Sequence, residues 1–103
     1  MRILHIVSSI SQENGAMNVI MNYYRKLYTN GIQFDFLYFQ ESKINYDDEI
    51  IKYGGECFFC GGKNKLHTLI KIRKFVRQIN NYDLIENHEL YLTKIIKNCV
   101  LML

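Results

Sequence analysis

Three groups of residues in this sequence have types and spacings that could do chemistry. Gly15 lies in a loop of small polar residues, between an apolar run and the start of a helical pattern. His88 directly follows another apolar run. Cys57 and Cys60 have the C-x-x-C spacing of redox pairs and of zinc half-sites. Each group needs a particular structural context before its chemistry becomes available.

The loop around Gly15 suits the binding of an anion or a sugar. In doubly wound folds, ligands bind beyond the carboxyl ends of the strands, where a helix N-terminus favours negative charge. A glycine there lets a backbone amide approach a phosphate or sugar without a Cβ in the way. A glycine that only turns the chain is the alternative. The sequence has neither G-x-G-x-x-G nor a P-loop pattern, so nicotinamide, flavin and P-loop nucleotide chemistry are not indicated.

The cysteines do not have the context that metal or redox chemistry needs. A redox pair opens a helix, and a zinc half-site needs a second pair. The run ECFFC is typical of a strand, in which alternation points Cys57 and Cys60 to opposite faces. We therefore expect buried cysteines and no metal site. Three cysteines, including Cys99, also do not suit a disulfide framework, which favours a reducing cytoplasm.

The three histidines differ in their expected surroundings. His5 lies inside the first apolar run, and we expect a hydrogen-bonded core histidine that serves stability. His67 lies near the start of a basic helix and should be exposed. His88 follows the carboxyl end of a predicted strand, where binding sites gather, although an ordinary surface histidine is the alternative.

The elements that would position these residues alternate between strand and helix. Apolar runs predict strands at 2–7, 33–39, 56–60 and 82–86. Helical spacing predicts helices from 16 to about 30, through 48–55, over 65–80 and from 90 onward. This alternation predicts an α/β fold: a Rossmann-like three-layer sandwich with a mainly parallel sheet of about four strands and helices on both faces. The expected inner stripes are Ala16, Val19, Ile20, Tyr23 and Leu27 in the first helix, and Leu66, Leu69, Ile72, Val76 and Ile79 in the third.

Length and charge limit the possible partners. The chain has 103 residues, 49% hydrophobic content and a net charge of +3, which suits one folded domain and not a nucleic-acid-binding protein. Because the strand–helix repeat stops on an apolar segment, we expect 1–103 to be a single, incomplete domain. The cations of the 65–80 helix form either a solvated face or a surface for an anionic membrane.

The order of several segments adds a family resemblance. MRILHIVSSI, GAMNVIMNYYRKL, IQFDFLYF, DDEIIKYGGECFF, a basic helix and YDLIENHELYL follow one another along the chain. In this order they resemble the N-terminal, acceptor-side domain of the family 4 glycosyltransferases, which have the GT-B fold. The resemblance covers essentially the whole chain. It implies a Rossmann-like domain that supplies one side of a cleft, while a second domain holds most of the nucleotide-sugar.

The resemblance also implies roles for individual residues. The family's Gly-Gly-Ala-Glu-like loop begins at Asn14, with matches at Gly15 and Ala16, and it lies near the donor diphosphate. The family's His-x-His-like turn falls on 86–88, with a match at His88, which would lie near the transferred sugar as the catalytic group.

The substrates implied by the resemblance are a nucleotide-sugar donor and a glycan or lipid-linked acceptor, with no bound cofactor. The expected reaction is retaining hexosyl transfer in cell-surface polysaccharide or glycolipid biosynthesis, in the cytoplasm or at the inner face of the membrane. We expect the 103-residue chain alone to be inactive. The alternative is a non-catalytic Rossmann-like remnant or protein-binding module.

Overall fold

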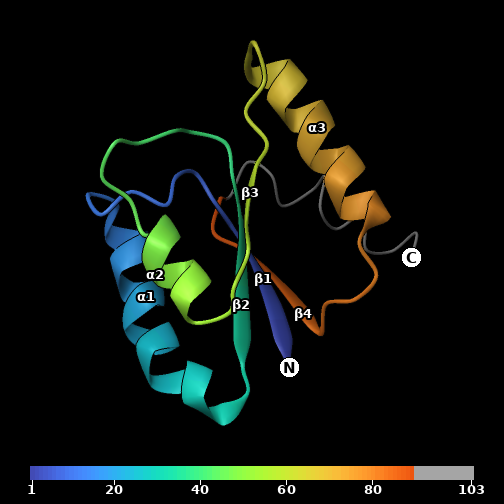
Figure 1. Cartoon of the computed structure of the whole chain (residues 1–103). Coiled ribbons are helices and arrows are strands. Elements are labelled where there is room, and N and C mark those ends of the chain that lie inside the picture. The colour runs from blue at the N-terminus through green and yellow to red at the C-terminus, as the bar shows by residue number, and fades with distance from the viewer. Residues whose placement is uncertain (90–103) are drawn as a thin grey trace.

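The computed structural model describes residues 1–89 of the chain (Figure 1). The predicted last helix from residue 90 and Cys99 lie outside the described residues. In chain order the elements are β1 (Arg2–Val7), α1 (Gly15–Leu27), the 3₁₀ turn η1 (Tyr28–Asn30), β2 (Gln33–Tyr38), α2 (Asp47–Lys52), β3 (Cys57–Phe59), α3 (Lys65–Gln78) and β4 (Leu84–Asn87). Within 1–89, no helix is long and apolar enough to span a bilayer.

The strands form one parallel sheet with the order β3-β2-β1-β4. Helices α1 and α2 cover one face of the sheet and α3 covers the other (Figure 1). The predicted fold class, a parallel α/β sandwich with helices on both faces, is therefore confirmed. The predicted strand positions are also correct, with bounds that differ by at most two residues at either end.

Alternation along the central strand β1 divides the core into two halves. Leu4 and Ile6 are fully buried on the α3 side, together with Ile72 and Val76 of that helix. Val7 is buried on the other side, against α1 and α2. Because β1 and β2 are covered on both faces, apolar residues point to both sides of these strands, and the polar residues in their interiors, His5 and Asp35, are buried as well.

The predicted inner stripe of α1 is wrong for three of its residues. Ala16 is exposed, Val19 and Tyr23 are 55% and 60% exposed, and the buried residues of α1 are Met17, Ile20, Met21 and Tyr24. Both sets have helical spacing and share Ile20, because apolar residues extend over a wide arc of this helix. Periodicity alone could not choose between the two stripes. The packing of Tyr24 against Phe34 of β2, with ring centroids 4.6 Å apart, favours the observed one.

In α3 the predicted stripe is correct except at its start. Ile72 and Val76 are fully buried and Leu69 and Ile79 pack against them, but Leu66 is 68% exposed. Figure 1 shows that α3 begins beyond the carboxyl ends of the strands. The first turn of this helix therefore has no sheet beneath it.

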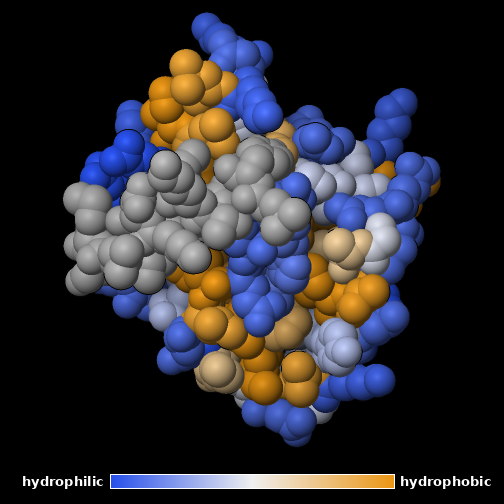
Figure 2. Space-filling view, turned by 180° about the vertical axis from the view of Figure 1, so that it is seen from behind, coloured by the Kyte–Doolittle hydropathy of each residue, from blue (hydrophilic) through white to orange (hydrophobic). Residues whose placement is uncertain are grey.

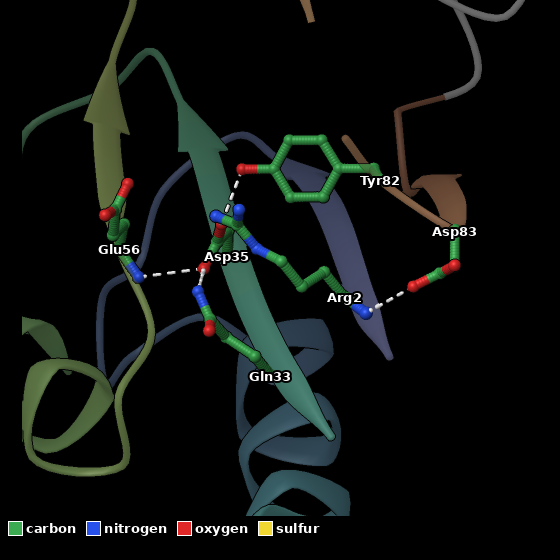
Figure 3. A network of polar contacts seen from close by, with 6 residues as sticks. All are labelled: Arg2, Gln33, Asp35, Glu56, Tyr82 and Asp83. Carbon is green, nitrogen blue, oxygen red and sulfur yellow. Dashed lines mark hydrogen bonds and ion pairs between the residues drawn. The ribbon is translucent and has the colours of Figure 1, made fainter. Parts of the chain in front are cut away.

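One buried carboxylate connects all four strands near their amino ends (Figure 3). Asp35 of β2 is fully buried and accepts hydrogen bonds from Arg2 of β1 at 2.7 Å, from Gln33 at 2.8 Å and from Tyr82, which precedes β4. It also accepts the backbone N–H of Glu56, which leads into β3, at 3.0 Å. Burial alone would raise the pKa of Asp35, but the hydrogen bonds outweigh it and leave this pKa below its ordinary value.

Replacing Asp35 with asparagine should lower the free energy of unfolding at pH 7 by about 2–3 kcal/mol, because Arg2 and Tyr82 lose a charged acceptor. The exposed loop residue Glu41 provides a matched control as Glu41→Gln, which should change stability by less than about 0.5 kcal/mol. Urea denaturation measures both differences.

The effect of Asp35→Asn should also depend on pH in one direction. Since the pKa of Asp35 is lowered in the folded chain, its contribution is fully present above the unfolded pKa of about 3.9 and is lost as the pH falls below it. The gap in stability between wild type and variant should therefore narrow in acid. A gap that widens below pH 4 would contradict this account of the network.

Candidate functional site

The parallel pairing of β1 with β4 brings His5 and His88 to the same face of the sheet. In this register His5 lies opposite Glu86. Side chains two residues apart on a strand point to the same face, so His88 follows Glu86 there. The backbone N–H of His88 donates to the carbonyl of Ile6 at 2.9 Å. This bond extends the β1–β4 ladder by one residue and fixes the position of the His88 backbone.

The three side chains are in mutual contact. Nδ1 of His5 lies 3.0 Å from Nε2 of His88 and 3.6 Å from Oε2 of Glu86. Nε2 of His88 lies 3.9 Å from the same carboxylate oxygen. The two imidazole rings stack with centroids 5.3 Å apart and an interplanar angle of 22°. The predicted catalytic histidine is therefore half of a histidine pair.

The surroundings of His5 keep its imidazole neutral. The ring is 3% exposed and contacts Phe34 and Phe36, at centroid distances of 4.3 Å and 5.3 Å. Burial, and to a lesser degree the neighbouring His88, lower the pKa of His5 to about 3. A neutral imidazole is a donor at one nitrogen and an acceptor at the other. At neutral pH, His5 can therefore offer a lone pair or an N–H to whatever faces it.

A groove of about 360 Å³ opens in front of this pair. Its polar wall is His5, Glu86 and His88, and its apolar wall includes Val19 and Tyr23 of α1. Val19 and Tyr23, which were wrongly predicted as core residues, thus line the groove. Figure 2 shows that the face turned away in Figure 1 carries hydrophobic patches among hydrophilic residues.

The predicted loop residues lie at the N-terminus of α1. Asn14 caps the helix, because its side-chain oxygen accepts the N–H of Met17 at 3.3 Å, and its Nδ2 donates to the carbonyl of Ser9 at 3.1 Å. Gly15 and Ala16 are exposed in the first turn. Among the described glycines only Gly31 and Gly54 have positive φ, so Gly15 does not serve a left-handed turn. A Cβ at Gly15 would meet no atom within 4 Å, so the space above it is open.

A second hollow, of about 460 Å³, lies beside this loop at the carboxyl edge of the sheet. Ser9, Ser11 and Glu13 line it from the loop after β1, and 40–44 line it from the loop after β2. The N–H of Gln12 donates to the carbonyl of Ile44 at 3.1 Å and holds the two loops together. The hollow is polar and open, which suits a hydroxylated or charged ligand better than an apolar one.

The loop after β1 and the residues after β4 meet at Ser8. The backbone N–H of Ser8 donates to Oε1 of Glu89 at 2.9 Å, and Nδ2 of Asn14 lies 3.4 Å from Oγ of Ser8. The structure therefore brings Asn14 and the His88 segment to one region without direct contact between them. Sequence analysis missed both Glu89 and the role of His5. For His5, the combination of strand register and period-two alternation could have revealed the pairing.

The two described cysteines lie on opposite faces of the sheet, as predicted. Cys57 packs against the α1 side of the core, and Cys60 is buried on the α3 side. Burial, followed by the nearby Asp47 carboxyl, raises the pKa of Cys57 to about 12, and burial also raises the pKa of Cys60. Both thiols are therefore protonated at neutral pH and unsuited to act as nucleophiles.

The described residues define a Rossmann-like α/β sandwich with a candidate site near the carboxyl edge of its parallel sheet. The chain is 31% identical over 90 residues to a Bacillus subtilis (strain 168) protein named "Putative glycosyltransferase EpsF". The match covers 84% of this chain and 23% of that protein, so the chain spans about a quarter of its relative's length. This distant homology supports a glycosyltransferase family. No family profile matches the chain, and neither does any solved structure.

The open space above Gly15 leads to a prediction about stability. Gly15→Ala should leave the free energy of unfolding unchanged or raise it by up to about 1 kcal/mol, because the new methyl group meets nothing and alanine restricts the unfolded chain. Gly55→Ala is the matched control. Its Cβ would lie 2.2 Å from the carbonyl oxygen of Phe34, which should cost about 1–3 kcal/mol. Thermal melts that show Gly15→Ala to be the more damaging change would contradict this description of the loop.

Proposed function

We propose that this chain is the acceptor-side part of a nucleotide-sugar-dependent glycosyltransferase of family 4, with the GT-B fold. The observation that carries the proposal is the 31% identity to a protein named as a glycosyltransferase, over 84% of the chain. The parallel sheet supports it, because the loop after β1 and the segment after β4 approach one another at the carboxyl edge, where such folds bind ligands.

In this proposal the donor diphosphate lies over the N-terminus of α1. The first N–H groups of a helix have no partner within the helix, and the helix dipole favours negative charge there. Asn14 keeps the loop in place by capping the helix and holding Ser9. The absence of a side chain at Gly15 lets a phosphate approach the backbone.

His88 is the proposed catalytic residue, near the transferred sugar. A hydrogen bond from its imidazole would count most where charge develops in the transition state. His5 lies behind it at 3.0 Å and acts as a positioning residue, because its own ring is buried between aromatic neighbours. By family analogy the reaction would be hexosyl transfer with retention.

The complete enzyme would contain a further domain that binds most of the nucleotide-sugar, and the acceptor would be a glycan or a lipid-linked sugar. This arrangement fits a role in cell-surface polysaccharide or glycolipid biosynthesis in the cytoplasm. No cofactor is needed for such a transfer. The polar hollow between the loops after β1 and β2 is the proposed place for the hydroxyl-rich acceptor.

A chimera tests the proposal, with this chain in place of the matching segment of the Bacillus subtilis relative. Release of nucleotide from a panel of nucleotide-sugars is the measurement. Gly15→Val should raise the KM for the donor, because a branched side chain fills the space above the loop. His88→Ala should lower kcat by roughly tenfold to a thousandfold, as expected for loss of one polar group.

His67→Ala is the control for the chimera, since His67 is exposed on α3 and remote in sequence from the site. It should leave both kinetic constants unchanged. Activity in the parent chimera that survives both Gly15→Val and His88→Ala would contradict the assigned site. A folded chimera with no activity toward any donor would favour the alternative, a non-catalytic binding module.

We also propose that α3 holds the protein at an anionic membrane surface, where a lipid-linked acceptor would lie. Cations on or just before this helix include Lys63, Lys74 and Arg77, all exposed. Leu66 and Ile70 are 68% and 45% exposed on the same helix. Exposed apolar side chains beside cations are typical of a helix that contacts lipid head groups.

Liposome cosedimentation of the full chain tests this attraction. Replacing Lys63, Lys74 and Arg77 with glutamine should weaken binding to anionic vesicles, at about 1 kcal/mol per charge, and salt should weaken the wild type. The control variant has glutamine at Lys26, Lys43 and Lys52, which are exposed outside α3. It should bind the vesicles as well as the wild type does. Equal losses in the two triple variants would contradict a specific role for α3.

A further inference from the structure

We propose that His5, Glu86 and His88 form a binding site for a divalent transition-metal ion, with Zn²⁺ as the expected ion. Sequence analysis gave no indication of this site, because it considered only the cysteines as metal ligands. Among residues 1–89 these three side chains bring their donor atoms within 4.8 Å of one another. The inference does not rest on the proposed function, since metal binding can be measured on this chain alone.

The donor atoms have the spacing that a small ion requires. The separations among Nδ1 of His5, Nε2 of His88 and Oε2 of Glu86 are 3.0, 3.6 and 3.9 Å. A triangle with these sides has a circumradius of about 2.1 Å, so one point lies at zinc–ligand distance from all three atoms. That point lies in the plane of the three atoms, so tetrahedral binding would need the two nitrogens to move apart by about 0.3 Å and Nε2 of His88 and Oε2 of Glu86 to approach by about 0.5 Å.

The chemistry of the donors favours zinc over magnesium or calcium. Imidazole nitrogens suit Zn²⁺, Cu²⁺ and Ni²⁺, whereas Mg²⁺ and Ca²⁺ prefer oxygen ligands throughout. Two histidines and one glutamate are the protein ligands of several catalytic zinc sites, which keep a fourth position open.

The surroundings of His5 limit the affinity of the site for a metal ion. A metal-binding histidine usually donates its second ring N–H to a partner, which fixes the ring and strengthens the ligand. Nε2 of His5 is buried and has no hydrogen-bond partner within the described part of the chain. Stacking against Phe36 and His88 orients the ring instead. We therefore expect weaker binding than in closed structural zinc sites.

The site is accessible from one side. The side chains of His5, His88 and Glu86 are 4%, 26% and 48% exposed, so the site grades from a buried nitrogen to a solvent-facing carboxylate. All three line the 360 Å³ groove, and the open coordination position would face that groove. An oxygen of a bound ligand could occupy it. With an ion on Nε2 of His88, a hydrogen bond from this residue to a sugar would have to come from Nδ1.

Titration of the metal-free full chain with Zn²⁺ and with Co²⁺ tests the proposal. We expect one ion per chain, visible d–d absorption of bound Co²⁺ and a rise in melting temperature with Zn²⁺. His88→Gln and Glu86→Gln should each weaken binding by at least about tenfold, since even outer-shell changes cost that much. Both residues are exposed enough for the variants to fold, and their circular dichroism should match the wild type.

Control variants separate this site from other histidines and from the thiols. His67→Gln removes an exposed histidine outside the site and should leave affinity unchanged. Undiminished binding in both His88→Gln and Glu86→Gln, or an equal loss in His67→Gln, would overturn the proposal. Thiolate-to-cobalt charge-transfer absorption would place the ion on a cysteine and would overturn it as well. So would a wild-type chain that binds neither ion.

Discussion

The arrangement of the whole sheet depends on the buried carboxylate of Asp35. A parallel sheet has no hairpins, so its neighbouring strands are joined only by long crossovers that do not by themselves fix the register. Asp35 supplies a common point for β1, β2, the start of β3 and the segment before β4. Leaving such a group without its partners would cost more than most single contacts in a domain of this size. The carboxylate therefore specifies one alignment of the strands.

The alignment at the amino edge determines the geometry several residues further along. Tyr82 donates to Asp35, and Asp83 bonds to the backbone of Arg2, so the register of β4 against β1 is defined at its start. In this register His5 lies opposite Glu86, and the N–H of His88 bonds to Ile6 near the end of β1. A shift of one residue would turn Glu86 and His88 to the α3 face. The histidine pair is thus a distant consequence of a structural contact.

The sequence predicted the elements well because strands and helices have different apolar periods. β1 and β2 are mostly apolar runs covered on both faces, and they lie where expected. The predicted inner face of α1 was wrong because Met17 and Val19 are both apolar. Only packing against Phe34 and Phe36 distinguishes the buried stripe from the exposed one. The predicted burial of Leu66 was wrong because periodicity does not reveal where a helix extends past its sheet.

The candidate site could be predicted only in part for the same reason. Gly15 and His88 follow strands directly, so their places could be read from the chain. The contact between His5 and His88 joins residues 83 positions apart and depends on strand order, which a local pattern does not contain. His5 was expected to serve only stability because its burial could be inferred from the pattern of β1 alone. The presence of His88 beside it depends on the strand order and could not be inferred.

The contact between the two imidazoles is the central claim, and nuclear Overhauser effects in the metal-free full chain test it most directly. With ring centroids 5.3 Å apart, the ring protons of His5 and His88 should show cross-relaxation with each other, and those of His5 also with Phe34 and Phe36. Cross-relaxation of His5 with the phenylalanines but not with His88 would contradict the account. It would mean that β4 does not hold His88 beside β1.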